Sequence, residues 1–166
     1  MLVILVGPTS MGKGSVIKSL KEIYGWKKVP TYSNRAKRLN DDKIYLDEAL
    51  INGGDYFVQR AYGNVYAQKR VDIYNLSLSH DVYVFDISFD YVKDFNKYTE
   101  YFFSIIPESE SDYVNNVIKS GREERLEQAI KEYRFLVSKI NSSPVFPIVT
   151  NDISQACKII NERVGK

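Results

Sequence analysis

Residues 7–15 have the sequence Gly7-Pro8-Thr9-Ser10-Met11-Gly12-Lys13-Gly14-Ser15, and they follow directly on an apolar run from Met1 to Val6. The segment from Gly7 to Lys13 keeps the spacing G-x-x-x-x-G-K. In such loops the glycines let backbone N–H groups surround phosphate oxygens, and the lysine adds a positive charge. Apolar residues from Val16 onward recur at helical spacing, so the positive end of a helix dipole would face the same anion. The pattern therefore predicts a strand, a phosphate-binding loop and a helix.

One position departs from the usual phosphate-binding loop. Most such loops carry Ser or Thr directly after the lysine to ligate Mg²⁺, whereas this chain has Gly14 and places Ser15 one position later. A glycine-rich turn that merely joins a strand to a helix is the alternative interpretation. The loop resembles that of adenylate kinases, whose lysine is likewise followed by glycine and a hydroxyl residue. This resemblance implies that Ser15 bonds a phosphate oxygen and that Mg²⁺ is held largely through water and the nucleotide.

Length and composition favour one compact folding unit. The chain has 166 residues, of which 44% are apolar, so it can bury one substantial core, and we expect a single domain over residues 1–166. The net charge of +2 gives no basic excess of the kind that coats nucleic acid or a membrane surface. A single cysteine, Cys157, excludes an internal disulfide framework and fits a reducing compartment. Because the apolar run at Met1–Val6 is too short to span a membrane and lacks a basic leader, we expect a cytoplasmic protein.

Apolar runs alternate with helical patterns along the chain, which predicts an α/β fold with a parallel sheet. Strands are expected at residues 1–6, 26–31, 55–60, 64–66, 81–86, 101–107 and 145–149. Helices are expected from residue 13 onward and at 44–52, 69–77, 111–119, 123–140 and 153–164. Residues 32–68 have the character of an insertion between two core parts, 1–31 and 69–166.

A second candidate site lies in the segment Thr31-Tyr32-Ser33-Asn34-Arg35-Ala36-Lys37-Arg38. Arg35 and Arg38 follow a cluster of hydroxyl residues on an expected loop. Guanidinium groups bind phosphate dianions bidentately, so the two arginines could clamp a phosphorylated acceptor. A solvated basic loop without a ligand is the alternative interpretation.

Together these segments resemble guanylate kinases, which carry a Gly-Pro-x-x-x-Gly-Lys loop, a T-T-R-x-x-R segment and a Gly-Asn-Tyr-Tyr-Gly turn. The matching segments here are Ser33-Asn34-Arg35-x-x-Arg38 and Gly63-Asn64-Val65-Tyr66. The resemblance continues through Asp86, the pair Ile106-Pro107, the pair Arg125-Leu126 and the pair Asn151-Asp152, and so spans nearly the whole chain. It implies a P-loop nucleoside monophosphate kinase fold with a three-layer core, a small inserted acceptor-binding segment and a short lid at about residues 119–125.

The resemblance also implies roles for individual residues. The ATP site would comprise Gly7, Ser10, Gly12, Lys13, Gly14, Ser15 and Asn151. The acceptor site would comprise Thr31, Arg35, Arg38, Gln59, Tyr66 and Asp86. Lys13, Arg122 and Arg125 would be catalytic, because phosphoryl transfer depends mainly on positioning and charge neutralisation. No side chain would ligate Mg²⁺ directly, with Ser15 and Asp86 as the candidates to hold its water. A structural cap on a helix is the alternative role for Asp86.

One departure concerns the base of the acceptor. A gapless alignment puts Phe57 where guanylate kinases carry the glutamate that reads guanine, and a phenyl ring accepts no such hydrogen bond. Gln59 lies two residues further along the same strand face, and Thr31 could replace a family serine that bonds guanine. The expected substrates are therefore ATP, with Mg²⁺, and GMP, dGMP or a related nucleotide.

The expected function is a kinase that acts on small-molecule nucleotides as a monomer or homodimer, without nucleic-acid or membrane partners. Two alternatives remain open. One is a guanylate kinase-like binding module that has lost catalysis, against which the intact Gly7, Gly12 and Lys13 argue. The other is a kinase of a different phosphorylated acceptor, such as a sugar phosphate, which the residue Phe57 leaves possible.

Overall fold

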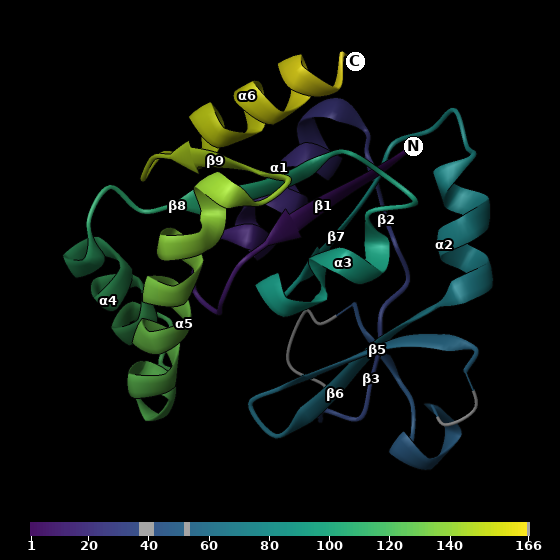
Figure 1. Ribbon diagram of the computed structural model, residues 1–166, viewed down its shortest axis with the longest axis horizontal. Helices are drawn as coiled ribbons and strands as arrows, with labels where there is room; N and C mark the ends of the chain where they lie inside the picture. The colour runs from purple at the N-terminus through teal and green to yellow at the C-terminus, as the bar shows by residue number, and fades with distance from the viewer. Residues whose placement is uncertain (37–41, 52–53, 166) are drawn as a thin grey trace.

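A computed structural model describes residues 1–36, 42–51 and 54–165 (Figure 1). Its main sheet has five strands in the order β2-β7-β1-β8-β9, and every neighbouring pair is parallel. The strands are β1 (Leu2–Val6), β2 (Lys27–Lys28), β7 (Tyr83–Ile87), β8 (Phe102–Ile106) and β9 (Val145–Val149). The chain therefore leaves the central strand β1 directly into the glycine loop, at the carboxyl edge of the sheet, where parallel α/β sheets bind their ligands.

Helices cover both faces of this sheet (Figure 1). Val3 and Leu5 of β1 pack in one core cluster with α1 (Lys13–Tyr24) and α6 (Ile153–Val164). Leu2 and Ile4 point to the opposite face, which packs against α3 (Val92–Phe95), α4 (Glu110–Lys119) and α5 (Leu126–Lys139). Side chains of a strand alternate between faces, so two apolar faces require two helical layers. The predicted three-layer α/β fold is confirmed. None of the helices that the structure describes is long and apolar enough to span a bilayer.

A second, smaller sheet comes from residues 32–69 (Figure 1). Its order is β4-β3-β6-β5, built from β3 (Tyr32–Ser33), β4 (Ile44–Tyr45), β5 (Tyr56–Ala61) and β6 (Asn64–Lys69). Strands β5 and β6 form an antiparallel hairpin, and β3 and β4 are parallel. α2 (Arg70–Ser77) follows β6 and returns the chain to the main sheet through its buried Ile73.

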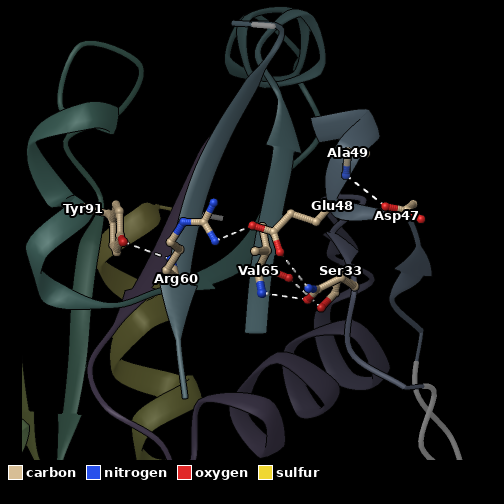
Figure 2. A network of polar contacts seen from close by, with 8 residues as sticks. Ser33, Asp47, Glu48, Ala49, Arg60, Val65 and Tyr91 are labelled. Atoms are coloured by element: carbon tan, nitrogen blue, oxygen red, sulfur yellow. Dashed lines mark hydrogen bonds and ion pairs between the residues drawn. The ribbon is translucent and has the colours of Figure 1, made fainter. Parts of the chain in front are cut away.

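Polar contacts fix the strand that precedes Arg35 against the hairpin (Figure 2). Arg60 on β5 donates to Glu48 at 2.6 Å, and the other carboxylate oxygen of Glu48 accepts a bond from Asn34 at 3.3 Å. The Asn34 side-chain oxygen in turn accepts from the backbone N–H of Val65 at 2.8 Å. The hydroxyl of Ser33 donates to the carbonyl of Val65 at 2.7 Å. Residues 33 and 34 are thereby held at a defined place beside β6.

The prediction of a helix at residues 44–52 is wrong. Ile44 and Leu46 instead extend beside β3, because their backbone N–H groups donate to the carbonyls of Thr31 and Ser33 at 2.9 and 3.0 Å. Only one 3-10 turn, η1 (Glu48–Ile51), remains helical, and Asn52 lies outside the described residues. The apolar spacing in this segment serves the small sheet, and sheet pairing overrides local helical preference.

Smaller differences concern element ends. The strand expected at 26–31 is paired only over β2, and the strand expected to end at Asp86 continues to Ile87, which pairs with Val6. The helix expected at 123–140 divides into η3 (Glu123–Arg125), α5 and η4 (Ile140–Ser142). Sequence periodicity also missed η2 (Phe89–Tyr91) and the short α3 after β7.

Candidate functional site

The glycine loop between β1 and α1 has a backbone that ordinary residues rarely adopt. Gly7 and Gly12 have φ values of 144° and 81°, and Ser10 has a φ of 61°. A side chain on Gly7 would come within 2.8 Å of the Met11 sulfur, so Met11 would have to shift to admit one. Left-handed conformations of non-glycine residues cost about 1–3 kcal/mol and cluster at functional sites. The loop is therefore built to curl its backbone in front of the first turn of α1.

Lys13 is the first residue of α1 and is only 9% exposed. Its ammonium donates to the carbonyls of Gly7 and Pro8 at 2.7 and 2.6 Å. Burial lowers the pKa of Lys13, while the carboxylates of Asp86 and Glu132 act in the opposite direction. A buried cation without a close anionic partner is costly, and a bound phosphate would supply that partner.

The two candidate lid arginines lie where α4 gives way to α5. Arg122 donates to the Thr9 hydroxyl at 2.6 Å and to the Ser10 hydroxyl at 3.4 Å, so it contacts the glycine loop directly. Arg125 is only 17% exposed and pairs with Glu124 at 3.1 Å. Its guanidinium carbon lies 4.7 Å from the centroid of the Tyr62 ring.

A cationic cluster surrounds Tyr66 on the small sheet. The guanidinium of Arg35 lies 5.9 Å from the centroid of the Tyr66 ring, and the ammonium of Lys43 lies 5.5 Å from it. Sequence reasoning did not single out Lys43. Arg38, the other predicted member of this site, lies outside the described residues. The described members unite a guanidinium, an ammonium and a phenol hydroxyl, which are suitable donors for a phosphate monoester.

A chain of buried side-chain hydrogen bonds connects Gln59 to Thr31. The backbone N–H of Ser88 donates to the Gln59 oxygen at 3.2 Å, and the Gln59 nitrogen donates to the Gln68 oxygen at 3.3 Å. The Gln68 nitrogen donates to the Thr31 hydroxyl at 3.3 Å, which donates to the carbonyl of Val29 at 3.4 Å. A backbone donor at one end and a backbone acceptor at the other fix the orientation of both amides. Gln59 keeps one N–H and one carbonyl lone pair for a ligand.

One large cavity unites these groups. Its volume is about 1220 Å³, and it is lined by every predicted site residue that the structure describes. These are Gly7, Ser10, Gly12, Lys13, Gly14, Ser15, Thr31, Arg35, Gln59, Tyr66, Asp86, Arg122, Arg125 and Asn151. Among the described lining residues, nine are Lys or Arg and two are Asp, although the whole chain has a net charge of only +2. Such an excess of positive charge in a concave site favours polyanionic ligands.

Asn151, one of the predicted site residues, already has polar contacts in the protein. The Asn151 side chain donates to Asp112 at 3.2 Å and accepts from the backbone N–H of Glu108 at 3.3 Å, which fixes it against the first turn of α4. Asp86 lies next to the last residue of β7, at the same sheet edge as the glycine loop. Within the part of the chain that the structure describes, no three His, Cys, Asp or Glu side chains cluster closely enough to hold a metal ion.

The structure corrects the position inferred for Phe57. Its ring is only 5% exposed and packs against Phe95 and Tyr98, with ring centroids 4.6 and 5.7 Å away. The guanidinium of Arg70 lies 4.1 Å over the same ring. Phe57 therefore belongs to the hydrophobic core, and Gln59 and Ala61 are the β5 residues on that face that line the cavity.

We therefore expect Phe57→Glu to destabilise the fold. The change buries a carboxyl group and removes an aromatic ring from the core, so the free energy of unfolding should fall by about 3 kcal/mol or more. Urea unfolding followed by circular dichroism measures this loss. Val71→Glu, at an exposed position of α2, is the control and should change stability little. A stable Phe57→Glu protein with a new preference for guanine would contradict the observed packing.

Sequence reasoning missed three residues that the fold brings to the site. Lys43 and Tyr62 line the cavity, and Glu132 lies close enough to influence the charge of Lys13. Lys43 and Glu132 stand in ordinary charged segments, where no local pattern distinguishes them. The turn at Gly63-Asn64 marked the hairpin tip, but it gave no reason to select Tyr62.

Comparisons with known proteins bear on the fold. No protein-family model matches the sequence, and no curated protein matches it. In contrast, 70 chains of solved structures match. One is the crystal structure of guanylate kinase from Anaplasma phagocytophilum, with a TM-score of 0.70 and 16% sequence identity over 99% of this chain and 84% of that chain. The chain therefore has a guanylate kinase-like P-loop fold.

Proposed function

We propose that this chain is an ATP-dependent nucleoside monophosphate kinase of guanylate kinase type. One observation carries the proposal: a single cavity is lined both by Lys13 with its glycine loop and by Arg35 with Tyr66. Arg122 contacts the glycine loop, and Arg125 contacts the hairpin that carries Tyr66. Two phosphate-binding groups joined by arginines are what a phosphoryl transfer between two nucleotides requires.

The glycine loop would hold the donor phosphates. The amides at the start of α1 lack intrahelical acceptors, and Lys13 can exchange its loop carbonyls for phosphate oxygens. Bound Mg²⁺ would neutralise charge on the phosphates. Ser15, in the first turn of α1, and Asp86, next to the last residue of β7, both line the cavity and would hold water around that ion.

Arg35, Tyr66, Lys43 and Arg38 would hold the acceptor phosphate. A phosphate monoester is already largely ionised near neutral pH, so its oxygen can attack without a catalytic base. Arg122 and Arg125 would stabilise the charge on the transferring phosphoryl group. Catalysis would then consist of alignment, charge neutralisation and exclusion of water.

Gln59 would read the base of the acceptor. A carboxylate accepts hydrogen bonds only, whereas the Gln59 amide both donates and accepts. Most nucleobase edges present a neighbouring donor and acceptor, so an amide fits more than one base. We propose GMP, dGMP or a related monophosphate as acceptor, with weaker base discrimination than a carboxylate would give.

Gln59→Glu should make the enzyme more selective for guanine. The carboxylate can accept from both donors on the guanine edge, and one good bidentate pair gives about tenfold or more discrimination. Steady-state kcat/KM for guanine and other monophosphates measures the ratio. Gln59→Met, which removes both hydrogen bonds that the amide would make to the base, should instead lower kcat/KM for all acceptors alike. If Gln59→Glu left the ratio of kcat/KM values for guanine and other bases unchanged, Gln59 would not contact the base.

A coupled assay of ADP formation tests the function itself. The protein is supplied with ATP, Mg²⁺ and each common ribo- and deoxyribonucleoside monophosphate in turn, with sugar phosphates as further acceptors. We expect ADP to form only when a nucleoside monophosphate is present. Transfer to a sugar phosphate alone would support the other acceptor class. ATP binding without transfer to any acceptor would refute the kinase proposal and favour a binding module.

A further inference from the structure

Tyr62 at the tip of the β5–β6 hairpin has an unfavourable backbone conformation. Its φ is 50°, and the following Gly63 has a φ of 72°. A two-residue hairpin turn with positive φ at both positions favours Asn, Asp or Gly at the first of them. A tyrosine in this conformation is strained, so contacts of its side chain must offset the strain.

The first such contact joins the hairpin to the core. The Tyr62 hydroxyl donates to one carboxylate oxygen of Glu132 on α5 at 2.7 Å, although the two residues lie 70 positions apart. The other oxygen of Glu132 accepts from Gln128 at 2.8 Å, which holds the carboxylate in place. Burial and this carboxylate raise the pKa of the Tyr62 hydroxyl, so it remains a donor at neutral pH.

The second contact concerns the lid. The guanidinium of Arg125 lies 4.7 Å from the centroid of the Tyr62 ring, and both side chains line the cavity. A cation over an aromatic face is attracted to the ring, so this contact favours one position of the guanidinium. Tyr62 is thus in contact both with α5 and with a proposed catalytic arginine.

We propose that Tyr62 is a positioning residue that couples closure of the hairpin to the placement of Arg125. The inference rests on the proposed kinase function. Tyr66, in the acceptor phosphate site, lies on β6 in the same hairpin. When the Tyr62 hydroxyl bonds Glu132, the hairpin places two groups at the transfer site together. These are Tyr66, which would bind the acceptor phosphate, and the Tyr62 ring, which contacts Arg125. The hydroxyl and the ring of Tyr62 therefore fix Arg125 and the acceptor segment relative to each other.

Tyr62→Phe separates the two contacts, because it keeps the ring and removes the hydroxyl. The lost hydrogen bond is to a charged group, so kcat should fall about tenfold or more and the acceptor KM should rise. The dissociation constant for ATP should not change. Tyr62→Leu also removes the ring and should lower kcat further. Tyr74→Phe, at an exposed tyrosine of α2, is the matched control.

Glu132→Gln completes the test, because it keeps an oxygen that can accept from Tyr62. Alone it should lower kcat, but less than Tyr62→Phe does, because the bond loses its charge; combined with Tyr62→Phe it should add little, since residues that act through one bond are not additive. Unchanged kcat and acceptor KM in Tyr62→Phe would overturn the inference. Fully additive losses in the double variant would overturn it as well, because they would separate the two residues.

Hydrogen exchange separates this inference from the proposed function. Backbone amides at residues 61–66 should exchange faster in Tyr62→Phe than in the wild type, measured without nucleotide. If the wild type transfers no phosphoryl group, the kinase proposal fails, and the exchange rates alone decide whether the hydroxyl holds the hairpin. If the wild type is active and neither the kinetics nor the exchange change in Tyr62→Phe, the positioning role of Tyr62 is wrong.

Discussion

Lys13→Ala should lower kcat by about 10³-fold or more while leaving the protein folded. Among the described residues, Lys13 is the only buried lysine. Its ammonium donates to two carbonyls of the glycine loop. Phosphate oxygens of the donor nucleotide would replace these two carbonyls as the acceptors of the ammonium. Because burial lowers the pKa of Lys13, its charge is unfavourable in the protein without an anion. Removing it should therefore cost little stability.

The measurement combines the ADP assay with thermal unfolding. Lys158→Ala, which removes an exposed lysine of α6, is the control and should leave both quantities unchanged. Lys13→Arg tests geometry, since the guanidinium keeps the charge but requires more space than the ammonium. If Lys13→Ala retained substantial turnover in a folded protein, the glycine loop could not be the donor phosphate site.

Arg125→Ala should lower kcat by about 10³-fold with little change in the dissociation constant of ATP. Arginines that neutralise a transferring phosphoryl group contribute about 10³–10⁵ in kcat. Arg125 is mostly buried and is held by Glu124 and by the ring of Tyr62, so its guanidinium is ordered before the reaction. A side chain that acts on the transition state affects kcat more than ground-state binding.

Arg125→Lys should recover little of this loss, because an ammonium lacks the planar set of donors that binds a phosphoryl group bidentately. Arg134→Ala on α5 removes an exposed arginine paired with Glu110 and serves as the control. A raised KM for ATP with unchanged kcat would reassign Arg125 to donor binding. Single-turnover measurements would separate that outcome from a change in product release.

The sequence sufficed for features that depend on local pattern. The apolar run before Gly7, the loop spacing and the helical period after it predicted β1, the glycine loop and α1. Buried strands such as β1 are continuous apolar runs, and a run of this kind suits a strand covered on both faces. Residues carried over from the family resemblance line one cavity because the order of the core elements matches that fold.

Features that depend on distant partners were not predictable. The helix expected at 44–52 failed because Thr31 and Ser33 offer carbonyls to Ile44 and Leu46, and no local signal reports that pairing. Phe57 has a plausible alignment, but its burial depends on Phe95, which lies in a helix that periodicity did not detect. The contact between Tyr62 and Glu132 likewise depends on how the small sheet packs against α5.

The crowding of cations around the cavity has a consequence for the folded chain itself. The described lining contains nine lysines and arginines and only two aspartates, so the site is a region of mutual repulsion. The folded chain must hold these charges close together whether or not a nucleotide is present. Their arrangement therefore lowers the free energy of unfolding, while it keeps the groups in place to bind phosphate. Inorganic phosphate, sulfate or any nucleotide that fills the site should relieve this repulsion and raise the melting temperature.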